Sequence, residues 1–336
     1  MITSRPIVEY TVVEFGELKD GAELSLALGQ ANQVQQGFRF DWGEAINIDL
    51  ERCRLPNGGY DLDAAAKETL QLKNLRKPVI LLTSLPYGDR AHAGEEDFFF
   101  FSEHWADQGV AIISTHLWKQ LATGRGMQVY LLMMLATEVF SNHTGLEFHY
   151  EIRGCLFDYC DHPSDAIKCL DSGTLCDNCE TYLQTKIRKG ELQLEYVAAA
   201  KRIFQRAVGK KCCFVVMPFA RSLKQVYDAI AKELTEEGWI VVRADERFRA
   251  RRIAESIREA IMTSDLVVAD LTDNNPNVYF ELGLSYVLGR DLILITQEKK
   301  VPIDIATEQR IKYSLSERGL RELSQKLRLM SGSGLF

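Results

Sequence analysis

The chain has 336 residues, of which 46% are hydrophobic and 26% are charged, and this composition predicts a folded globular protein of about two domains. Its 40 Lys and Arg stand against 47 Asp and Glu, which gives a formal net charge of −7. This balance excludes a general nucleic-acid binder, because long-range attraction to phosphate backbones is missing, although a local basic patch can still hold one phosphate.

Membrane insertion and secretion are not expected from the sequence. The longest apolar run, residues 129–136, is far shorter than the about 18 residues of a membrane span. The first residues lack the apolar core of a signal peptide. We therefore expect a cytoplasmic protein whose eight cysteines are reduced, a setting in which a Cys-x-x-Cys pair more often binds metal than forms a disulfide.

The first half of the chain has the pattern of a mixed α/β domain, expected over residues 1–183. Apolar spacing predicts strands at 6–15, 79–83 and 109–114. It predicts helices at 21–35, 61–75 and 128–141. A charged, helix-prone segment follows at 184–208. We interpret 184–209 either as a helical linker or as the last helix of the first domain.

From residue 210 to 336 the pattern changes to strict alternation of strands and helices. Strands are predicted at 212–217, 239–243, 266–270, 292–296 and 312–315, with helices at 223–237, 253–263, 278–288 and 319–329. The strands are continuous apolar runs, as expected where a parallel sheet is buried on both faces. This alternation requires right-handed crossovers and a doubly wound parallel sheet.

Ligands of such sheets bind beyond the carboxyl ends of the strands, so the residues there are candidate site residues. The candidate binding residues are Pro218, Phe219, Asp245, Asn275, Asn277 and Tyr279, and the candidate acids are Asp270 and Glu281. No histidine follows His162, so acid–base or nucleophilic work in this domain falls to carboxylates, with Tyr227 or Tyr279 as possible helpers.

The stretch SDLVVADLTDNNPNVYFELGLSYVLGRDLILIT, with FVVMPF, VRADE and VPIDI, resembles the nucleoside 2-deoxyribosyltransferase-like superfamily, which includes nucleotide N-glycosidases and is similar in fold to TIR-type NAD-cleaving domains. The resemblance covers about 120 residues and implies a flavodoxin-like fold. In that family the glutamate of the Glu-Leu-Gly turn, here Glu281, is the nucleophile on C1′. An aspartate opening the third strand, here Asp265, assists at the sugar or base.

One position departs from the transferase pattern. Asn275 stands where the transferases have a further acid, and Asp270 or Asp273 could substitute for it. The resemblance therefore implies cleavage or transfer at an N-glycosidic bond of a nucleoside, nucleotide or NAD, in a bacterial defence or signalling effector, without an organic cofactor. The alternative is a non-catalytic nucleotide-binding sensor or scaffold. Family members often share active sites between subunits, which implies a homo-oligomer.

Two further features near these strand ends have alternative interpretations. Arginines cluster after the second strand, at Arg243, Arg247, Arg249, Arg251 and Arg252. They could bind the phosphate of a nucleotide, or they could form a solvated helix start. Asn277 could cap the helix that carries Glu281 and so place a helix N-terminus at a ligand.

The cysteine-rich segment of the first half predicts a metal site. His149, Cys155, Cys176 and Cys179 have separations of 6, 21 and 3 residues, and the last two form a Cys-x-x-Cys knuckle. This spacing resembles the structural zinc site of archaemetzincins and implies a structural Zn²⁺, with His149 or Cys160 as the remaining ligand. The alternative is a set of free buried thiols.

The similarity to metzincins extends weakly upstream, but their catalytic motif is absent. Glu138 has Thr137 and Ser141 where two histidines four residues apart would hold a catalytic zinc. We therefore expect a non-proteolytic domain.

Overall fold

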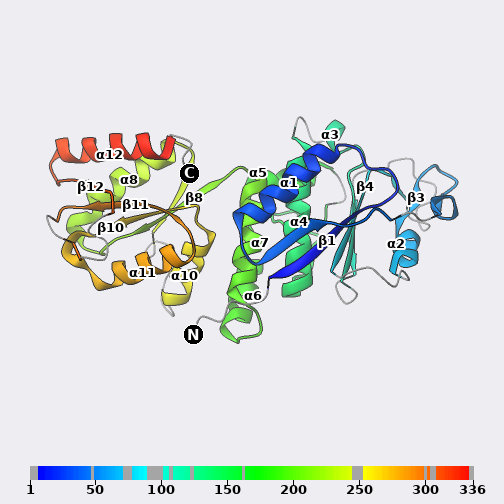
Figure 1. Ribbon diagram of the computed structural model, residues 1–336, viewed down its shortest axis with the longest axis horizontal. Helices are drawn as coiled ribbons and strands as arrows, with labels where there is room; N and C mark the ends of the chain where they lie inside the picture. Colours follow the sequence, from blue (N-terminus) through cyan, green and yellow to red (C-terminus); the bar gives the residue numbers. More distant parts are fainter. Residues whose placement is uncertain are drawn as a thin grey trace. The chain divides into compact units, whose positions relative to one another are not determined.

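The computed structural model describes residues 7–46, 49–70, 78–88, 101–105, 109–121, 125–160, 163–243, 253–298, 301–302 and 308–332. The chain divides into two compact units, unit 1 from Met1 to Gly209 and unit 2 from Lys210 to Phe336. Both are α/β, and both contain a mostly parallel five-stranded sheet (Figure 1). Within the described ranges, no helix has the length and apolar character needed to cross a membrane.

Unit 1 is built on a sheet of order β2-β1-β4-β7-β6, with β6 antiparallel and the other strands parallel. Its strands are β1 (Val8–Glu14), β2 (Phe38–Trp42), β4 (Val79–Thr83), β6 (Phe101–Trp105) and β7 (Val110–Ser114), and β3 (Tyr60–Asp61) pairs separately with β5 (Tyr87–Gly88). Its helices are α1 (Gly21–Val34), η1 (Leu50–Cys53), α2 (Leu62–Leu70), α3 (Trp118–Leu121), α4 (Met127–Thr144), α5 (Pro163–Ser172), α6 (Asp177–Arg188) and α7 (Leu194–Ala207).

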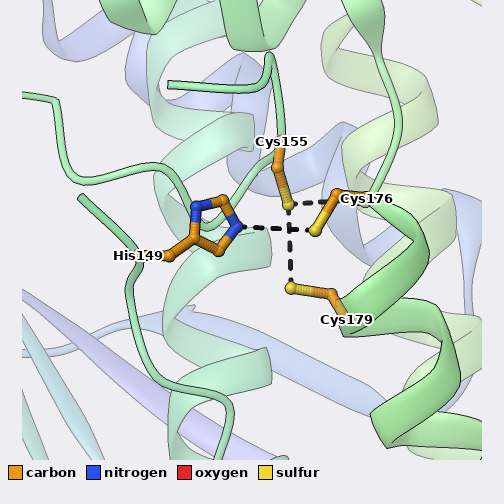
Figure 2. A group of neighbouring side chains, drawn as sticks. All are labelled: His149, Cys155, Cys176 and Cys179. Carbon is orange, nitrogen blue, oxygen red and sulfur yellow. Dashed lines mark hydrogen bonds between the residues drawn. The ribbon is translucent and has the colours of Figure 1, made fainter. Parts of the chain in front are cut away.

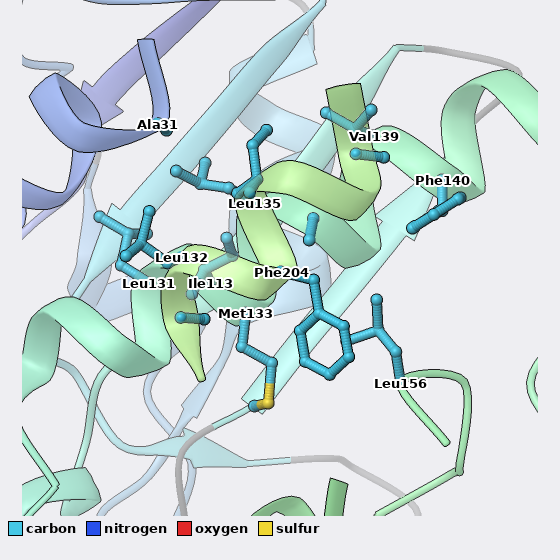
Figure 3. Close-up of a cluster of buried hydrophobic side chains, with 14 of the residues drawn as sticks. Ala31, Ile113, Leu131, Leu132, Met133, Leu135, Val139, Phe140, Leu156 and Phe204 are labelled. Carbon is cyan, nitrogen blue, oxygen red and sulfur yellow. The ribbon is translucent and has the colours of Figure 1, made fainter. Parts of the chain in front are cut away.

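The larger core of unit 1 lies between one face of this sheet and the helices α1, α4 and α7. Helix α4 is apolar around most of its circumference, which is the pattern of a helix buried on all sides. Phe204 of α7 lies among Met133 of α4 and Leu156 of the following loop (Figure 3). The segment 184–209 thus belongs to unit 1 and contributes to its core.

Unit 2 has five parallel strands in the order β12-β11-β10-β8-β9. They are β8 (Lys211–Val216), β9 (Trp239–Arg243), β10 (Leu266–Asp270), β11 (Asp291–Thr296) and β12 (Arg310–Lys312). The helical segments are η3 (Arg221–Leu223), α8 (Lys224–Glu236), α10 (Ile253–Thr263), η4 (Thr272–Asn274), α11 (Pro276–Val287) and α12 (Glu317–Gly332).

Both faces of this sheet are covered, which explains why its strands are continuous apolar runs. Helices α8 and α12 pack on one face, and α10 and α11 pack on the other (Figure 1). Alternate residues of β8 serve the two cores: Cys213 and Val215 belong to the first, and Phe214 and Val216 to the second.

Two predicted elements differ from the structure. The single helix expected at 184–208 is two helices, because Gly190 adopts a left-handed conformation, with φ of 73°, that ends α6. The amide N–H of Glu191 also donates to the carbonyl of Lys186, which closes this turn. The fifth strand of unit 2 lies at Arg310–Lys312, slightly before the predicted 312–315.

Candidate functional site

Four side chains from separate parts of unit 1 converge on one point. They are His149, Cys155, Cys176 and Cys179, and their ligand atoms all lie within 4.8 Å of one another. His149 and Cys155 come from loop segments, whereas Cys176 is the N-cap of α6 and Cys179 lies in its first turn (Figure 2). The Cys-x-x-Cys spacing brings the two sulfur atoms together because the first turn of a helix directs residues three apart to the same side.

Two separations within this cluster are close to those of a tetrahedral zinc site. Sγ of Cys155 lies 3.8 Å from Sγ of Cys179, and Sγ of Cys176 lies 3.6 Å from Nε2 of His149. Zinc bonds of about 2.3 Å to sulfur and about 2.0 Å to nitrogen at tetrahedral angles predict S···S and S···N separations of about 3.8 and 3.6 Å. The cluster is thus compatible with a zinc site, and it contains His149 rather than Cys160 beside the three sulfur atoms.

The backbone around the cluster supports negatively charged sulfur. The sulfur of Cys155 accepts hydrogen bonds from the amide N–H groups of Phe157, at 3.4 Å, and Cys176, at 3.2 Å. The hydrogen bond between the Cys155 and Cys179 sulfur atoms and these two amides lower the pKa of Cys155 to about 5, although burial opposes the shift. A thiolate is the form of cysteine that binds metal.

His149 is held by groups on the far side of its ring. Burial lowers its pKa, but hydrogen bonds with Cys155 and the carbonyl of Glu151 outweigh burial and raise the pKa overall. Nδ1 lies 3.2 Å from the Glu151 carbonyl and 3.1 Å from Oδ1 of Asp158. Nε2 is left to face the sulfur atoms.

Helix α4 carries the residues that occupy the positions of a protease metal motif. Thr137 donates its hydroxyl to the carbonyl of Met133, and Glu138 is fully buried. Within the described residues, no hydrogen-bond partner reaches either carboxyl oxygen of Glu138 or the hydroxyl of Ser141. Burial raises the pKa of Glu138 well above its usual range, which favours the neutral form, and the side chain belongs to the core.

In unit 2 the predicted site lies at the carboxyl ends of β8 and β10. Strand β8 leads through α8 to β9 on one side, whereas β10 leads through α11 to β11 on the other. This reversal of direction between β8 and β10 is where open α/β sheets bind ligands. Pro218 is buried directly after β8, and Phe219 beside it is 60% exposed.

Asp270 closes β10 and is fully buried in a hydrogen-bond network. Its Oδ1 accepts from the amide and the hydroxyl of Thr272, at 3.1 and 2.6 Å. Its Oδ2 accepts from the hydroxyl of Tyr313, at 2.6 Å. Burial raises the pKa of Asp270 while these donors oppose the shift. Its acceptor atoms are thus engaged in fixing the loop after β10.

Asp265 lies at the opposite end of the strand. Its amide N–H donates to the carbonyl of Cys212, and its Oδ2 accepts from the Cys212 amide at 2.9 Å. Since β10 advances about 3.3 Å per residue, Asp265 is about 16 Å along the strand from Asp270. The structure therefore does not bring Asp265 to the carboxyl edge of the sheet.

Glu281 lies about a turn and a half into α11, a helix that contacts β10 and β8. It shares the inward side of the helix with Val278 and Ser285, which are both buried, and is itself half-buried. Burial raises the pKa of Glu281 to about 7. Side chains of a helix tilt toward its N-terminus, so this carboxylate is directed back toward the carboxyl edge.

The helix start is capped by Asn275, not by Asn277 as expected. Oδ1 of Asn275 accepts from the amide of Asn277 at 2.9 Å, and Pro276 occupies the first helical position. Asn277 is exposed and half-buried Tyr279 donates its hydroxyl to Asn274. The amide of Asn275 is thus turned to the backbone rather than to a ligand.

The arginine cluster and the second strand end are described only in part. Arg243 stacks on the ring of Tyr227, 4.1 Å from its centroid, with Nη1 3.9 Å from the sulfur of Met217. Asp245 and the arginines at 247, 249, 251 and 252 lie outside the described residues.

Three supporting residues were not predicted from the sequence: Asp158, Thr272 and Tyr313. Asp158 and Thr272 lie within a few residues of candidate ligands, but an isolated Asp or Thr in a loop is too common to indicate such a role. Tyr313 is 43 residues from Asp270, and only the pairing of β12 with β11 brings it near.

No family model and no curated protein matches the sequence. Among solved structures, the chain is similar to an archaemetzincin from Methanopyrus kandleri, with 14% identity, a TM-score of 0.41 and coverage of 56% of this chain and 99% of that chain. It is also similar to a CMP N-glycosidase from Clostridium botulinum, with 19% identity, a TM-score of 0.29 and coverage of 34% of this chain and 99% of that chain. The roles of individual residues therefore depend on the geometry of this chain itself.

Proposed function

We propose that unit 2 cleaves an N-glycosidic bond of a nucleoside, nucleotide or NAD, with Glu281 as the nucleophile. The observation that carries this proposal is the half-buried Glu281 carboxylate on the inward side of α11, with a pKa raised to about 7. A perturbed carboxyl group directed toward the carboxyl ends of parallel strands is a strong candidate for a reacting group. The resemblance of the 264–296 segment to nucleoside-processing enzymes gives the same residue the same role.

The strand order supports a flavodoxin-like sheet in this proposal. Counting strands from the start of unit 2, the observed order is 2-1-3-4-5 read from β9 to β12. In that arrangement the ligand crevice lies between the first and third strands, here β8 and β10. In this proposal exposed Phe219, directly after β8, stacks on the base, and Glu281 reaches the sugar from α11.

The proposed reaction has two steps. A carboxylate oxygen of Glu281 attacks C1′, and the C1′–N bond breaks with its electron pair leaving on the base. Water then attacks C1′ of the resulting ester, which releases the sugar with a hydroxyl group and restores the carboxylate, and the second proton of the water passes to the departed base. Because Asn275 caps the helix in place of an acid, hydrolysis is favoured over transfer to a second base.

Base release tests this proposal. Wild-type protein is incubated with nucleosides, 5′-monophosphates including CMP, and NAD, and the free base is quantified by chromatography. We expect Glu281→Gln to reduce release by at least about 100-fold, the range seen when a reacting group is removed. Glu317→Gln, at an exposed position of α12, is the matched control and should retain the wild-type rate. No base release by the wild type on any of these substrates would contradict the proposal.

The same experiment separates the second candidate function, nucleotide binding without cleavage. Asn275 caps α11 and stands where the transferases have a further acid, and the lack of that acid favours binding without cleavage. Calorimetric binding of a nucleotide with no release of base, and equal affinity in wild type and Glu281→Gln, would support it.

We also propose that unit 1 holds a structural Zn²⁺ on His149, Cys155, Cys176 and Cys179. The support is the match of the S···S and S···N separations to a tetrahedral site, and the Asp158 carboxylate behind the histidine ring. Four protein ligands leave no open position for substrate, which is typical of structural rather than catalytic zinc. When bound, the ion would fasten the loop around Cys155 to the start of α6.

A further inference from the structure

A second pair of thiols lies beside the metal cluster and is not used by it. Sγ of Cys160 lies 3.9 Å from Sγ of Cys169, whereas neither residue belongs to the four-residue cluster. Cys160 is in the loop that follows Asp158, and Cys169 is in α5. The two cysteines therefore belong to two different segments of unit 1, a loop and a helix.

The two thiols differ in their access to solvent. All eight cysteines lie in the described part of the chain, and Cys160 is the only one of them that is exposed. Cys169 is 2% exposed, directly behind it. An exposed thiol meets a dissolved oxidant first, and a buried thiol in van der Waals contact is positioned to react with the oxidised product.

The pair also forms part of a cavity wall. Cys160 and Cys169 both line a cavity of about 170 Å³, together with His104 of β6 and Met133 of α4. Cys160 donates its thiol to the carbonyl of Asp158 at 3.4 Å, and Sγ of Cys169 lies 3.8 Å from Oδ2 of the same residue. A bond between the two sulfurs would thus alter the cavity wall next to the metal cluster.

We propose that Cys160 and Cys169 are a reversible oxidation site that forms an intramolecular disulfide in response to a peroxide. The Cys160 sulfur attacks the peroxide, which yields a sulfenic acid and one molecule of water. The Cys169 sulfur then attacks the sulfenic sulfur, forming the disulfide and releasing a second water, so that two thiols and one H₂O₂ give one disulfide and two waters. The sulfur atoms must approach by about 2 Å to reach the bond length of about 2.05 Å, a movement within the reach of side-chain rotation.

The competing pair is Cys155 and Cys179, whose sulfur atoms lie 3.8 Å apart. They are 1% and 4% exposed, and a bound metal would protect them, because coordinated thiolates are not free to attack. Exposure thus makes Cys160 the thiol that reacts with the oxidant, and its contact with Cys160 makes Cys169 the partner in the disulfide.

Mass spectrometry of the full chain, purified with its metal and treated with H₂O₂, tests the proposal. Tryptic cleavage after Arg153, Lys168 and Lys186 places Cys160 and Cys169 on different peptides, but the first peptide also carries Cys155 and the second also carries Cys176 and Cys179. The variants Cys160→Ser and Cys169→Ser resolve this ambiguity. We expect one linked peptide pair per chain in the wild type, its loss in each variant, its reversal by dithiothreitol, and unchanged zinc content.

Three results would overturn the proposal. The first is a linked pair that persists in Cys160→Ser, since the bridge would then join cluster cysteines. The second is zinc release in step with disulfide formation, for the same reason. The third is oxidation of Cys160 to a sulfinic acid, or a dimer linked through Cys160, while Cys169 stays reduced. Cys53→Ser, at a buried thiol elsewhere in unit 1, is the matched control and should leave the linked pair unchanged.

Discussion

Nδ1 of His149 lies 3.1 Å from Oδ1 of Asp158, and this contact joins the metal cluster to the loop beneath it. The other oxygen of Asp158 accepts hydrogen bonds from the amide groups of Arg153, Gly154 and Cys155, at 2.7 to 3.0 Å. One carboxylate thus sets the path of the backbone that leads to Cys155, and its other oxygen lies beside the imidazole ring without a hydrogen bond among the described residues. A carboxylate behind a ligating histidine is a common way to fix which ring nitrogen faces a metal.

We expect Asp158→Asn to weaken zinc binding by about 10- to 100-fold, the range for groups that orient a ligating histidine. The amide preserves the shape of the side chain but removes the charge and one of the two acceptor oxygens. Competition with a chromophoric chelator measures the affinity. Asp171→Asn, at a side chain that is 62% exposed, should bind zinc as the wild type does. Equal affinities in both variants would show that Asp158 acts on the loop alone.

Zinc content distinguishes the two interpretations of the fourth ligand. We expect one zinc per chain in the wild type and in Cys160→Ser, and a loss of most zinc in His149→Ala, because the structure places His149 and not Cys160 at the cluster. Elemental analysis after gel filtration measures the stoichiometry. The reverse pattern would make Cys160 the ligand.

Metal removal should destabilise unit 1 selectively. The cluster ties loop segments to α6, and without an ion three sulfur atoms are held close together with no counter-charge. We expect treatment with a chelator at neutral pH to lower the melting temperature of unit 1 and to leave that of unit 2 unchanged. Acid should also lower the melting temperature of unit 1, because protonation of the cysteine thiolates weakens their binding to the ion. Calorimetry with and without re-added zinc measures both effects.

The convergence of His149 with three cysteines could be predicted from the sequence because part of its signal is local: Cys176 and Cys179 stand three residues apart at one helix start. The doubly wound sheet of unit 2 was equally accessible, because β8, β9 and β10 are continuous apolar runs at regular intervals. Strands β2 and β6 were missed since they lie at sheet edges, where Phe38–Trp42 and Phe101–Trp105 mix charged and apolar residues.

The geometry of the candidate site of unit 2 could be predicted only in part. The positions of Asp265 and Glu281 in the sequence suggested one site. However, Asp265 directly precedes β10 and so lies at the amino edge of the sheet, whereas Glu281 is directed toward the carboxyl edge. The hydrogen bond between Tyr313 and Asp270 could not be predicted at all, because it depends on strand order rather than on spacing.

We expect Tyr313→Phe to destabilise unit 2 by about 1–3 kcal/mol. The substitution removes the hydroxyl that donates to Oδ2 of Asp270, and leaves a fully buried carboxyl oxygen without that donor. Urea unfolding followed by a probe of unit 2 measures the change. Tyr286→Phe, at a side chain that is 43% exposed, should change the free energy of unfolding by less than about 0.5 kcal/mol. Similar values for both variants would mean that the network around Asp270 contributes little.

The pH profile of base release tests the form in which Glu281 acts. A nucleophile must be ionised, and burial raises the pKa of Glu281 to about 7, so the rate should rise as pH increases through 7 and level off above it. Initial rates between pH 5 and 9 measure the profile. A rate that falls through the same window would instead identify Glu281 as a proton donor.

The contribution of Glu281 to stability should decrease as pH rises. A salt-bridged carboxylate behaves in the opposite way, because its contribution is lost as pH falls. The pKa of Glu281 is about 7 in the folded chain against an ordinary value of 4.5, so its protonated form is favoured by folding. Its contribution is complete below pH 4.5 and is lost as pH rises through 7. A shift of this size corresponds to at most about 3 kcal/mol, which partial exposure reduces to about 1–2 kcal/mol. We therefore expect Glu281→Gln to gain stability over the wild type between pH 5 and pH 8, measured by urea unfolding, whereas Glu317→Gln should follow the wild type. A difference that stays constant with pH would show that the carboxylate is well solvated, which would also remove the physical reason for assigning it the nucleophilic role.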